Sequence, residues 1–192
     1  MRQGSSDLSL ALRIAALTVI FVLLQISVVS GVSVFGVSAD ITPLLVAFVG
    51  LSCGSVTGAV TGFAVGLALD LSLVQTLGLT SLLYTLIGYW AGRVREVRDP
   101  QAALAPLLVG TAAAAISLFG YAVMEFLLGV DAPVSLDLLR QILIGVALDA
   151  ILALPVWFVV RRTLEGALPD DPRRRRRRRA YTTGGLSPLS KP

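Results

Sequence analysis

The residues that could do chemistry inside the apolar body of this chain are four ionisable side chains: Asp70, Glu125, Arg140 and Asp149. An ionisable group in mid-membrane costs about 2.5–3.5 kcal/mol on insertion scales, so each is expected to face protein or water. A proton relay would need carboxylates that recur along one helix, and these do not. An enzyme is therefore not expected.

The residue types that the chain lacks narrow the chemistry further. It contains no histidine and a single cysteine, Cys53. The absence of histidine excludes Ser-His-Asp and Cys-His catalysis and histidine-containing metal sites. A single cysteine excludes an internal disulfide. Its glycine row is not followed by Gly-Lys-Ser/Thr, so it is not a phosphate-binding loop. We expect no catalytic residue, cofactor or metal.

Position along the chain separates the four ionisable residues. Asp70 and Glu125 fall near the outer ends of their expected helices, where a solvated interfacial carboxylate is an equal alternative to a functional one. Arg140 lies near the same end and could pair with Glu125. Asp149 lies in the middle of its span, so it makes an internal hydrogen bond, is protonated by burial or lines a small cavity. We favour the structural hydrogen bond.

Composition places these residues in a membrane. The 192 residues are 55% hydrophobic and 15% charged, whereas a typical soluble domain has about 25% charged residues. The apolar runs predict an all-α integral membrane protein, a bundle of about six transmembrane helices within residues 14–162. The predicted helices are 14–29, 41–52, 56–73, 78–92, 103–128 and 138–160.

Two helix assignments leave alternatives open. The basic start, the first apolar run and Val37-Ser38-Ala39 resemble a secretory signal. We favour an uncleaved first helix, because the run is long and the small-residue site lies well beyond it. The stretch 41–73 would form one helix of about 50 Å, against a hydrocarbon core of about 30 Å. A turn is expected at 52–55, leaving 41–52 buried among its neighbours or partly re-entrant.

Positive charge predicts the orientation. Arginine and lysine gather in the segments 1–13, 93–102 and 161–192. Apart from Arg140, the intervening loops 30–40, 70–77 and 129–137 and the outer helix ends carry none. By the positive-inside rule, the N-terminus 1–13 and the tail 163–192 are cytoplasmic.

The tail has no apolar face and contains an arginine run, Arg173 to Arg179. We expect it to be disordered and to contact anionic lipid headgroups. Docking of an acidic cytoplasmic protein is the alternative. Nucleic-acid binding is not expected, because the high positive charge belongs to this tail rather than to the body.

A glycine row at Gly58, Gly62 and Gly66 forms a groove without side chains on the helix 56–73. Residues four apart lie on one side of a helix, drifting by about 40° per step. Small residues let a second membrane helix approach closely. The groove packs against either a partner or another helix of this chain. Asp70, further along the row, is interpreted as a helix-end or loop-organising carboxylate.

A longer pattern contains this row. Asp40-Ile41-Thr42-Pro43 precedes G-x-x-x-G-F-x-x-G-x-x-x-D, then L-G, then G-Y-x-x-G-R. The pattern resembles MreD, the rod shape-determining membrane protein family of bacteria. Two features depart from the family: the turn at 52–55 lacks a basic residue often found there, and the arginine tail is an extension. The matching residues are Gly58, Gly62, Phe63, Gly66, Asp70, Gly78, Gly88, Tyr89, Gly92 and Arg93.

The resemblance implies a non-enzymatic subunit of the elongasome, the lateral-wall machinery, in the bacterial cytoplasmic membrane. It implies a protein that binds and positions MreC, a single-span protein, by helix packing, and so regulates cell shape and peptidoglycan synthesis. Further implied partners are MreB, RodA and a transpeptidase. The implied fold is similar to that of the substrate-binding membrane subunits of energy-coupling-factor vitamin transporters.

That likeness supplies a rival hypothesis, a vitamin-like small-molecule binding subunit of a transporter. Such a site needs several convergent polar or aromatic groups. The short outer loops offer few, namely Asp40, Gln75, Thr76, Asp131 and Asp137. A structural or lipid-handling membrane protein is the third alternative.

Overall fold

The computed structural model describes residues 3–29, 33–34, 37–72, 78–97, 105–127, 129 and 136–165. Within these ranges the chain forms six α-helices, α1 Gln3–Leu24, α2 Ile41–Cys53, α3 Ser55–Ser72, α4 Leu79–Val97, α5 Ala105–Leu127 and α6 Leu136–Glu165. A π-helical turn, η1 Gln25–Val29, extends α1. Two short antiparallel strands, β1 Ser33–Val34 and β2 Val37–Ser38, precede α2. The arginine run of the tail lies outside the described residues.

The helices confirm an all-α integral membrane protein. Four of them are long and apolar enough to cross a membrane, with candidate spans at Leu8–Ser27, Ser55–Ser72, Ala105–Met124 and Leu139–Leu164. Large apolar side chains on their outer faces, such as Val56, Phe119 and Ile151, are exposed in the isolated chain. Lipid rather than water is the solvent that suits such faces.

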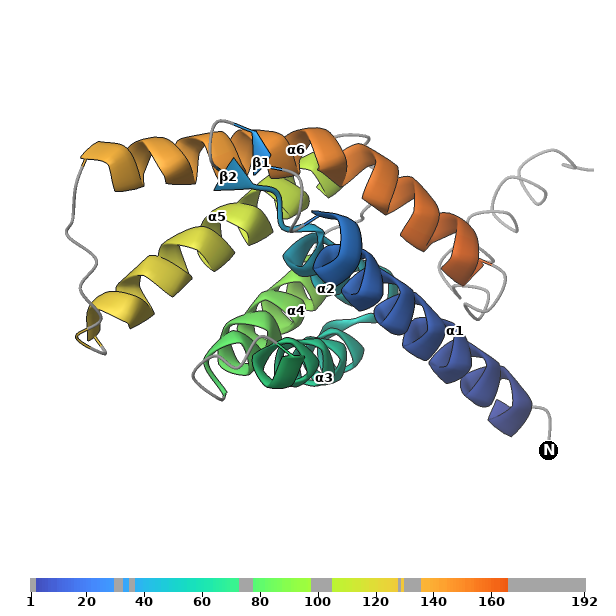
Figure 1. The fold of residues 1–192 in the computed structure, drawn as a ribbon. Helices are drawn as coiled ribbons and strands as arrows, with labels where there is room; N and C mark the ends of the chain where they lie inside the picture. Colours follow the sequence, from blue (N-terminus) through green and yellow to red (C-terminus); the bar gives the residue numbers. More distant parts are fainter. Residues whose placement is uncertain are drawn as a thin grey trace, which may run out of the picture.

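The short helix α2 is the centre of the molecule (Figure 1). Every residue from Ile41 to Ser52 is buried, because all the other helices pack around it. Phe48 contacts Trp157 of α6 edge to face, with ring centroids 5.3 Å apart. Of the two alternatives for this helix, burial among neighbours is the one observed.

The predicted turn at 52–55 is a single residue, Gly54, between α2 and α3. Its φ of +104° lies in a region that glycine adopts at little cost and other residues rarely adopt. The chain therefore reverses here with almost no loop, which brings α2 and α3 together.

Three helices extend beyond the predicted ranges. α1 begins at Gln3 rather than at residue 14, α4 continues to Val97, and α6 reaches Glu165. An apolar run does not mark where a helix must end: arginine and glutamate, which are good helix formers, continue α4 and α6 beyond their apolar runs. As a result Arg93 and Arg95 lie on α4 and not in a loop. α6 also contains Pro155 and changes direction along its length (Figure 1).

Candidate functional site

The glycine row of α3 lies against the backbone of α4. A Cβ atom added to Gly58 or Gly62 would overlap a main-chain carbonyl of α4, that of Gly88 or Tyr84 respectively. One added to Gly66 would overlap the backbone of Ser81. The Ser81 hydroxyl also donates a hydrogen bond of 2.9 Å to the Phe63 carbonyl of α3. The groove is therefore filled by a helix of the same chain.

Glycines of α4 and α2 complete this seam. A Cβ atom on Gly88 would overlap the Gly58 carbonyl, and one on Gly92 would overlap the backbone of Ser55. A Cβ atom on Gly50 of α2 would likewise overlap the Gly88 carbonyl of α4. Of the two alternatives for the groove, packing inside the chain is the one seen. The predicted role as a partner groove is corrected, because α4 occupies the space that a partner helix would need.

Asp70 ends the glycine row and organises the start of α4. Its Oδ2 accepts hydrogen bonds from the backbone N–H of Gly78 at 2.8 Å and of Ser81 at 3.4 Å. The first N–H groups of a helix lack helical acceptors, and a buried carboxylate supplies one. Gly78 itself has a φ of +93°. Asp70 and Gly78 of the sequence pattern thus meet at one helix start.

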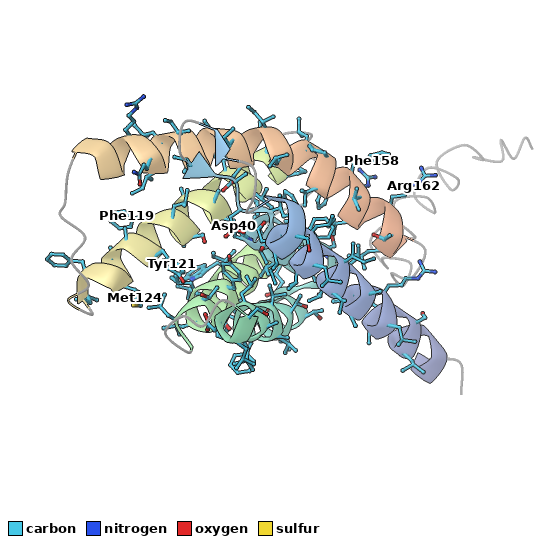
Figure 2. All side chains as sticks on the ribbon, viewed as in Figure 1. Asp40, Phe119, Tyr121, Met124, Phe158 and Arg162 are labelled. Carbon is cyan, nitrogen blue, oxygen red and sulfur yellow. The ribbon has the colours of Figure 1, made fainter. Side chains whose placement is uncertain are left out.

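A second polar cluster surrounds the N-terminus of α2. The Asp40 side chain caps the helix, accepting from the Thr42 N–H at 3.0 Å and from the Tyr84 hydroxyl at 2.7 Å. The Ile41 N–H donates to the Gln25 side-chain oxygen at 3.1 Å. The Asp40 N–H donates to Asp149 Oδ1 at 2.8 Å. Asp40 lies where several helices converge (Figure 2).

This cluster exists because α2 begins inside the protein. A buried helix start has no water for its N–H groups, so side chains must accept from them. Asp149 of α6 is buried and accepts an internal hydrogen bond, the role that we favour for it. The donor is the backbone N–H of Asp40, the residue that directly precedes α2. Asp40, which was expected on an outer loop, directly precedes α2 and lies beside Asp149 in the middle of α6.

An apolar groove of about 320 Å³ lies between α4 and α5. Trp90 in its wall is 58% exposed, and Ala112 and Ile116 on the facing helix are also exposed. The other lining residues are Leu86, Ile87, Ala91, Val94, Val109 and Ala113. This groove, unlike the glycine row, is open to a second molecule.

Comparison with protein families identifies the chain. The family model described as rod shape-determining protein MreD matches residues 8–165. The chain belongs to the MreD family. This membership supports a role in rod shape determination, and the family is one of shape-determining membrane proteins rather than a known enzyme family. Neither curated proteins nor solved structures gave a significant match, so the likeness to vitamin-transporter subunits stays a prediction.

The end of the MreD pattern, Gly-Tyr-x-x-Gly-Arg, lies over the turn between α2 and α3. The Ser55 hydroxyl donates to Glu96 Oε1 at 2.6 Å, and Arg93 pairs with Glu96 at 3.0 Å. These contacts hold the pKa of the Glu96 carboxyl below its usual value, with the Ser55 hydrogen bond as the larger cause. Arg95 donates to the Ser52 carbonyl near the C-terminus of α2.

Arg95 accounts for the missing basic residue of that turn. A cation near a helix C-terminus interacts favourably with the helix dipole. The turn itself carries no such charge, but α4 brings one to it from a distant part of the sequence. Arg95 thus places a basic group beside a turn where the resemblance led us to expect one.

The remaining predicted residues do not join these clusters. The Phe63 side chain is exposed on α3, and Tyr89 is exposed beside Trp90. Arg140 is exposed on α6. The Glu125 side chain lies outside the described residues, so the Glu125–Arg140 pair stays a prediction. Among described residues, no three His, Cys, Asp or Glu side chains gather as metal ligands would.

Sequence reasoning missed Gln25, Tyr84, Glu96 and Arg95. Asp40 carried a usable signal, because aspartate directly before an apolar helix with proline in its first turn is a typical N-cap. The partners of Asp40 carried none. They come from separate helices, and only the packing of those helices brings them together.

Proposed function

We propose that this protein is a non-enzymatic scaffold of the rod-shape machinery in the bacterial cytoplasmic membrane. In this proposal it binds the transmembrane helix of an MreC-like single-span protein and positions it for the elongation assembly of MreB, RodA and a transpeptidase. It thereby regulates cell shape and peptidoglycan synthesis. Membership of the MreD family supports the setting, and the open groove between α4 and α5 supports the mode of binding.

The groove has the features that a membrane helix can pack into. In lipid, helices associate through close van der Waals packing, so small residues on one face and large ones on the other favour contact. Ala112 and Ala113 form a shallow floor on α5, while Trp90 and Leu86 stand exposed on α4. The opposite face of α4 is already packed against α3 through the glycine seam.

The proposed orientation has both termini in the cytoplasm. It is supported by Arg13, near the start of the apolar span Leu8–Ser27, and Arg162, near the end of the span Leu139–Leu164, which line the same pocket. The start of the first candidate span and the end of the last therefore lie on one side. Arginine on that side fits the positive-inside rule.

Filling the groove tests the proposal. Ala112→Leu should lower the amount of MreC-like protein that co-purifies with the chain by about tenfold, because overpacking an interface costs roughly 1–3 kcal/mol. Trp90→Ala should weaken co-purification as well, through loss of an exposed aromatic anchor. The matched control is Ala64→Leu, the same change at an exposed position of α3.

The control separates folding from binding. Both alanine variants add the same side chain to a lipid-facing helix, so both should purify with unchanged thermal unfolding. Full co-purification of the MreC-like protein with Ala112→Leu, or equal loss with Ala64→Leu, would show that the α4–α5 groove is not the docking face.

A further inference from the structure

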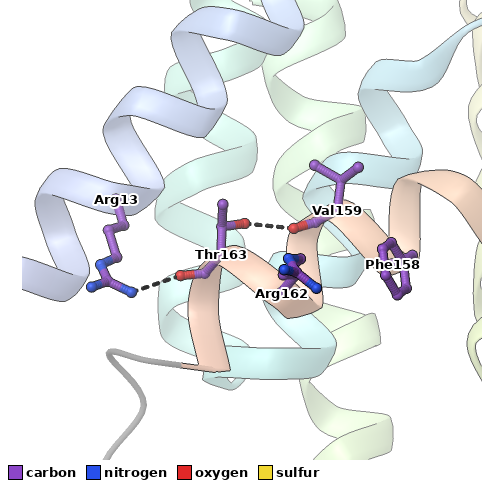
Figure 3. Close-up of a pocket in the computed structure, with 5 residues that line it drawn as sticks. All are labelled: Arg13, Phe158, Val159, Arg162 and Thr163. Atoms are coloured by element: carbon purple, nitrogen blue, oxygen red, sulfur yellow. Dashed lines mark hydrogen bonds between the residues drawn. The ribbon is translucent and has the colours of Figure 1, made fainter.

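A pocket of about 460 Å³ lies where α1 meets the end of α6 (Figure 3). Arg13 lines it from α1, and Phe158, Val159, Arg162 and Thr163 line it from α6. Two guanidinium groups from opposite ends of the described chain thus share one space. None of the five lining residues carries a carboxylate.

Arg13 is held in place by the end of α6. Its Nη1 donates a hydrogen bond of 2.9 Å to the Thr163 carbonyl. α6 ends at Glu165, so this carbonyl is one of the last four, which have no helical partner. The Thr163 hydroxyl turns back to the Val159 carbonyl at 2.6 Å. The contact fixes the Arg13 side chain and ties the first helix to the last.

Most of the donor capacity in the pocket stays unused. A guanidinium has five N–H donors, and Arg13 spends one of them on Thr163. Within the part of the chain that the structure describes, the Arg162 side chain makes no hydrogen bond or ion pair. Both arginines lie near the end of an apolar stretch, Arg13 near the start of the candidate span Leu8–Ser27 and Arg162 near the end of the span Leu139–Leu164.

We propose that this pocket binds the headgroup phosphate of an anionic phospholipid. Guanidinium groups bind phosphate oxygens through paired, charge-assisted hydrogen bonds. Basic pockets between transmembrane helices are known positions for anionic headgroups. Phe158, which is exposed beside Arg162, supplies an apolar wall for the adjoining acyl chain. None of the lining residues belongs to the arginine run of the tail, and a lipid bound here would join α1 to α6.

The test measures lipid retained by the full-length protein, tail included. The protein is purified in detergent, mixed with phosphatidylglycerol or phosphatidylcholine, and bound lipid is counted by native mass spectrometry. Arg162→Gln should lower phosphatidylglycerol affinity about fivefold, the factor for one arginine near an anionic surface. Arg140→Gln on the same helix is the matched control and should leave affinity unchanged.

A second variant protects the test against misfolding. Val159→Trp fills the pocket, keeps both arginines and changes an already lipid-facing side chain, so it should lower retention with unchanged thermal unfolding. Equal retention in all variants would overturn the proposal, as would equal loss with Arg140→Gln. An affinity for phosphatidylcholine equal to that for phosphatidylglycerol would overturn the proposal too. Displacement of the lipid by dilute inorganic phosphate would also overturn it, because it would show that the pocket is a site for free phosphate.

Discussion

The unit of α2, α3 and α4 and the outer helices α1, α5 and α6 pack by different means. In the inner unit, backbones touch through Gly50, Gly58 and Gly88, and carboxylates cap the helix starts. The outer helices meet their neighbours through side chains and leave the groove and the arginine pocket open. The difference teaches that the glycine pattern serves the fold, while the two openings at which we propose binding of other molecules lie where helices meet through side chains.

The largest expected effect comes from breaking the inner seam. Gly62→Leu places a side chain on the Tyr84 carbonyl, where only backbone movement could make room. Overpacking costs about 1–3 kcal/mol and occasionally more, and a site walled by backbone belongs to the costly end. We expect loss of the folded protein, measured as thermal unfolding in detergent and yield. Ala64→Leu, two residues along on the exposed face, should behave like the parent; equal stability of the two variants would contradict the seam.

The second-largest effect is expected from changing Asp149, which accepts a hydrogen bond at the N-terminus of α2. Two substitutions there separate the effect of the charge from that of the hydrogen bond. Asp149→Leu leaves the Asp40 N–H without an acceptor, at a cost of about 1–3 kcal/mol. Asp149→Asn keeps an oxygen at the same place and should cost little. The two variants are compared by chemical or thermal unfolding. A large loss with Asn would mean that the charge itself matters.

Tyr84→Phe should have a smaller effect in the same cluster. It removes a hydroxyl that donates to Asp40 Oδ2 at 2.7 Å and leaves the ring in place. Asp40 still accepts from the Thr42 N–H, so the helix cap survives. The expected loss is about 1 kcal/mol of unfolding free energy. When Tyr84→Phe is added to the Asp40→Ala variant, it should lower the unfolding free energy no further, because the acceptor of the tyrosine hydroxyl is gone. Losses that add up in the double variant would argue against the contact between Tyr84 and Asp40.

How much the sequence could predict follows from how local each feature is. Helices, the break at Gly54 and close packing along Gly58, Gly62 and Gly66 depend on neighbouring residues, and each was predictable. The contact of Asp40 with Asp149 joins positions 109 residues apart. No spacing rule reports such a pair, because it arises only when α2 is buried against α6.

The same reasoning explains why the surfaces could not be predicted. The glycine row was correctly expected to pack, but a helix pattern does not say which helix arrives, and α4 is the next one along the chain. The α4–α5 groove and the Arg13–Arg162 pocket had no sequence signal. Each is made of common residues, alanine, leucine or arginine, that gain meaning only from the helix opposite.

The smallest effect is expected at the end of the inner unit, where Glu96 ties α4 to the α2–α3 turn. Its pKa in the folded protein lies below the ordinary value of 4.5, chiefly through the Ser55 hydrogen bond. Folding therefore favours the carboxylate: its stabilisation is complete above the unfolded pKa and is lost as pH falls through the folded pKa. Because the pair with Arg93 is solvent-exposed, the loss is small and weakened by salt. Glu96→Gln should flatten the acid side of the unfolding-temperature profile, and a profile identical to the parent's would show that Glu96 does not stabilise the turn.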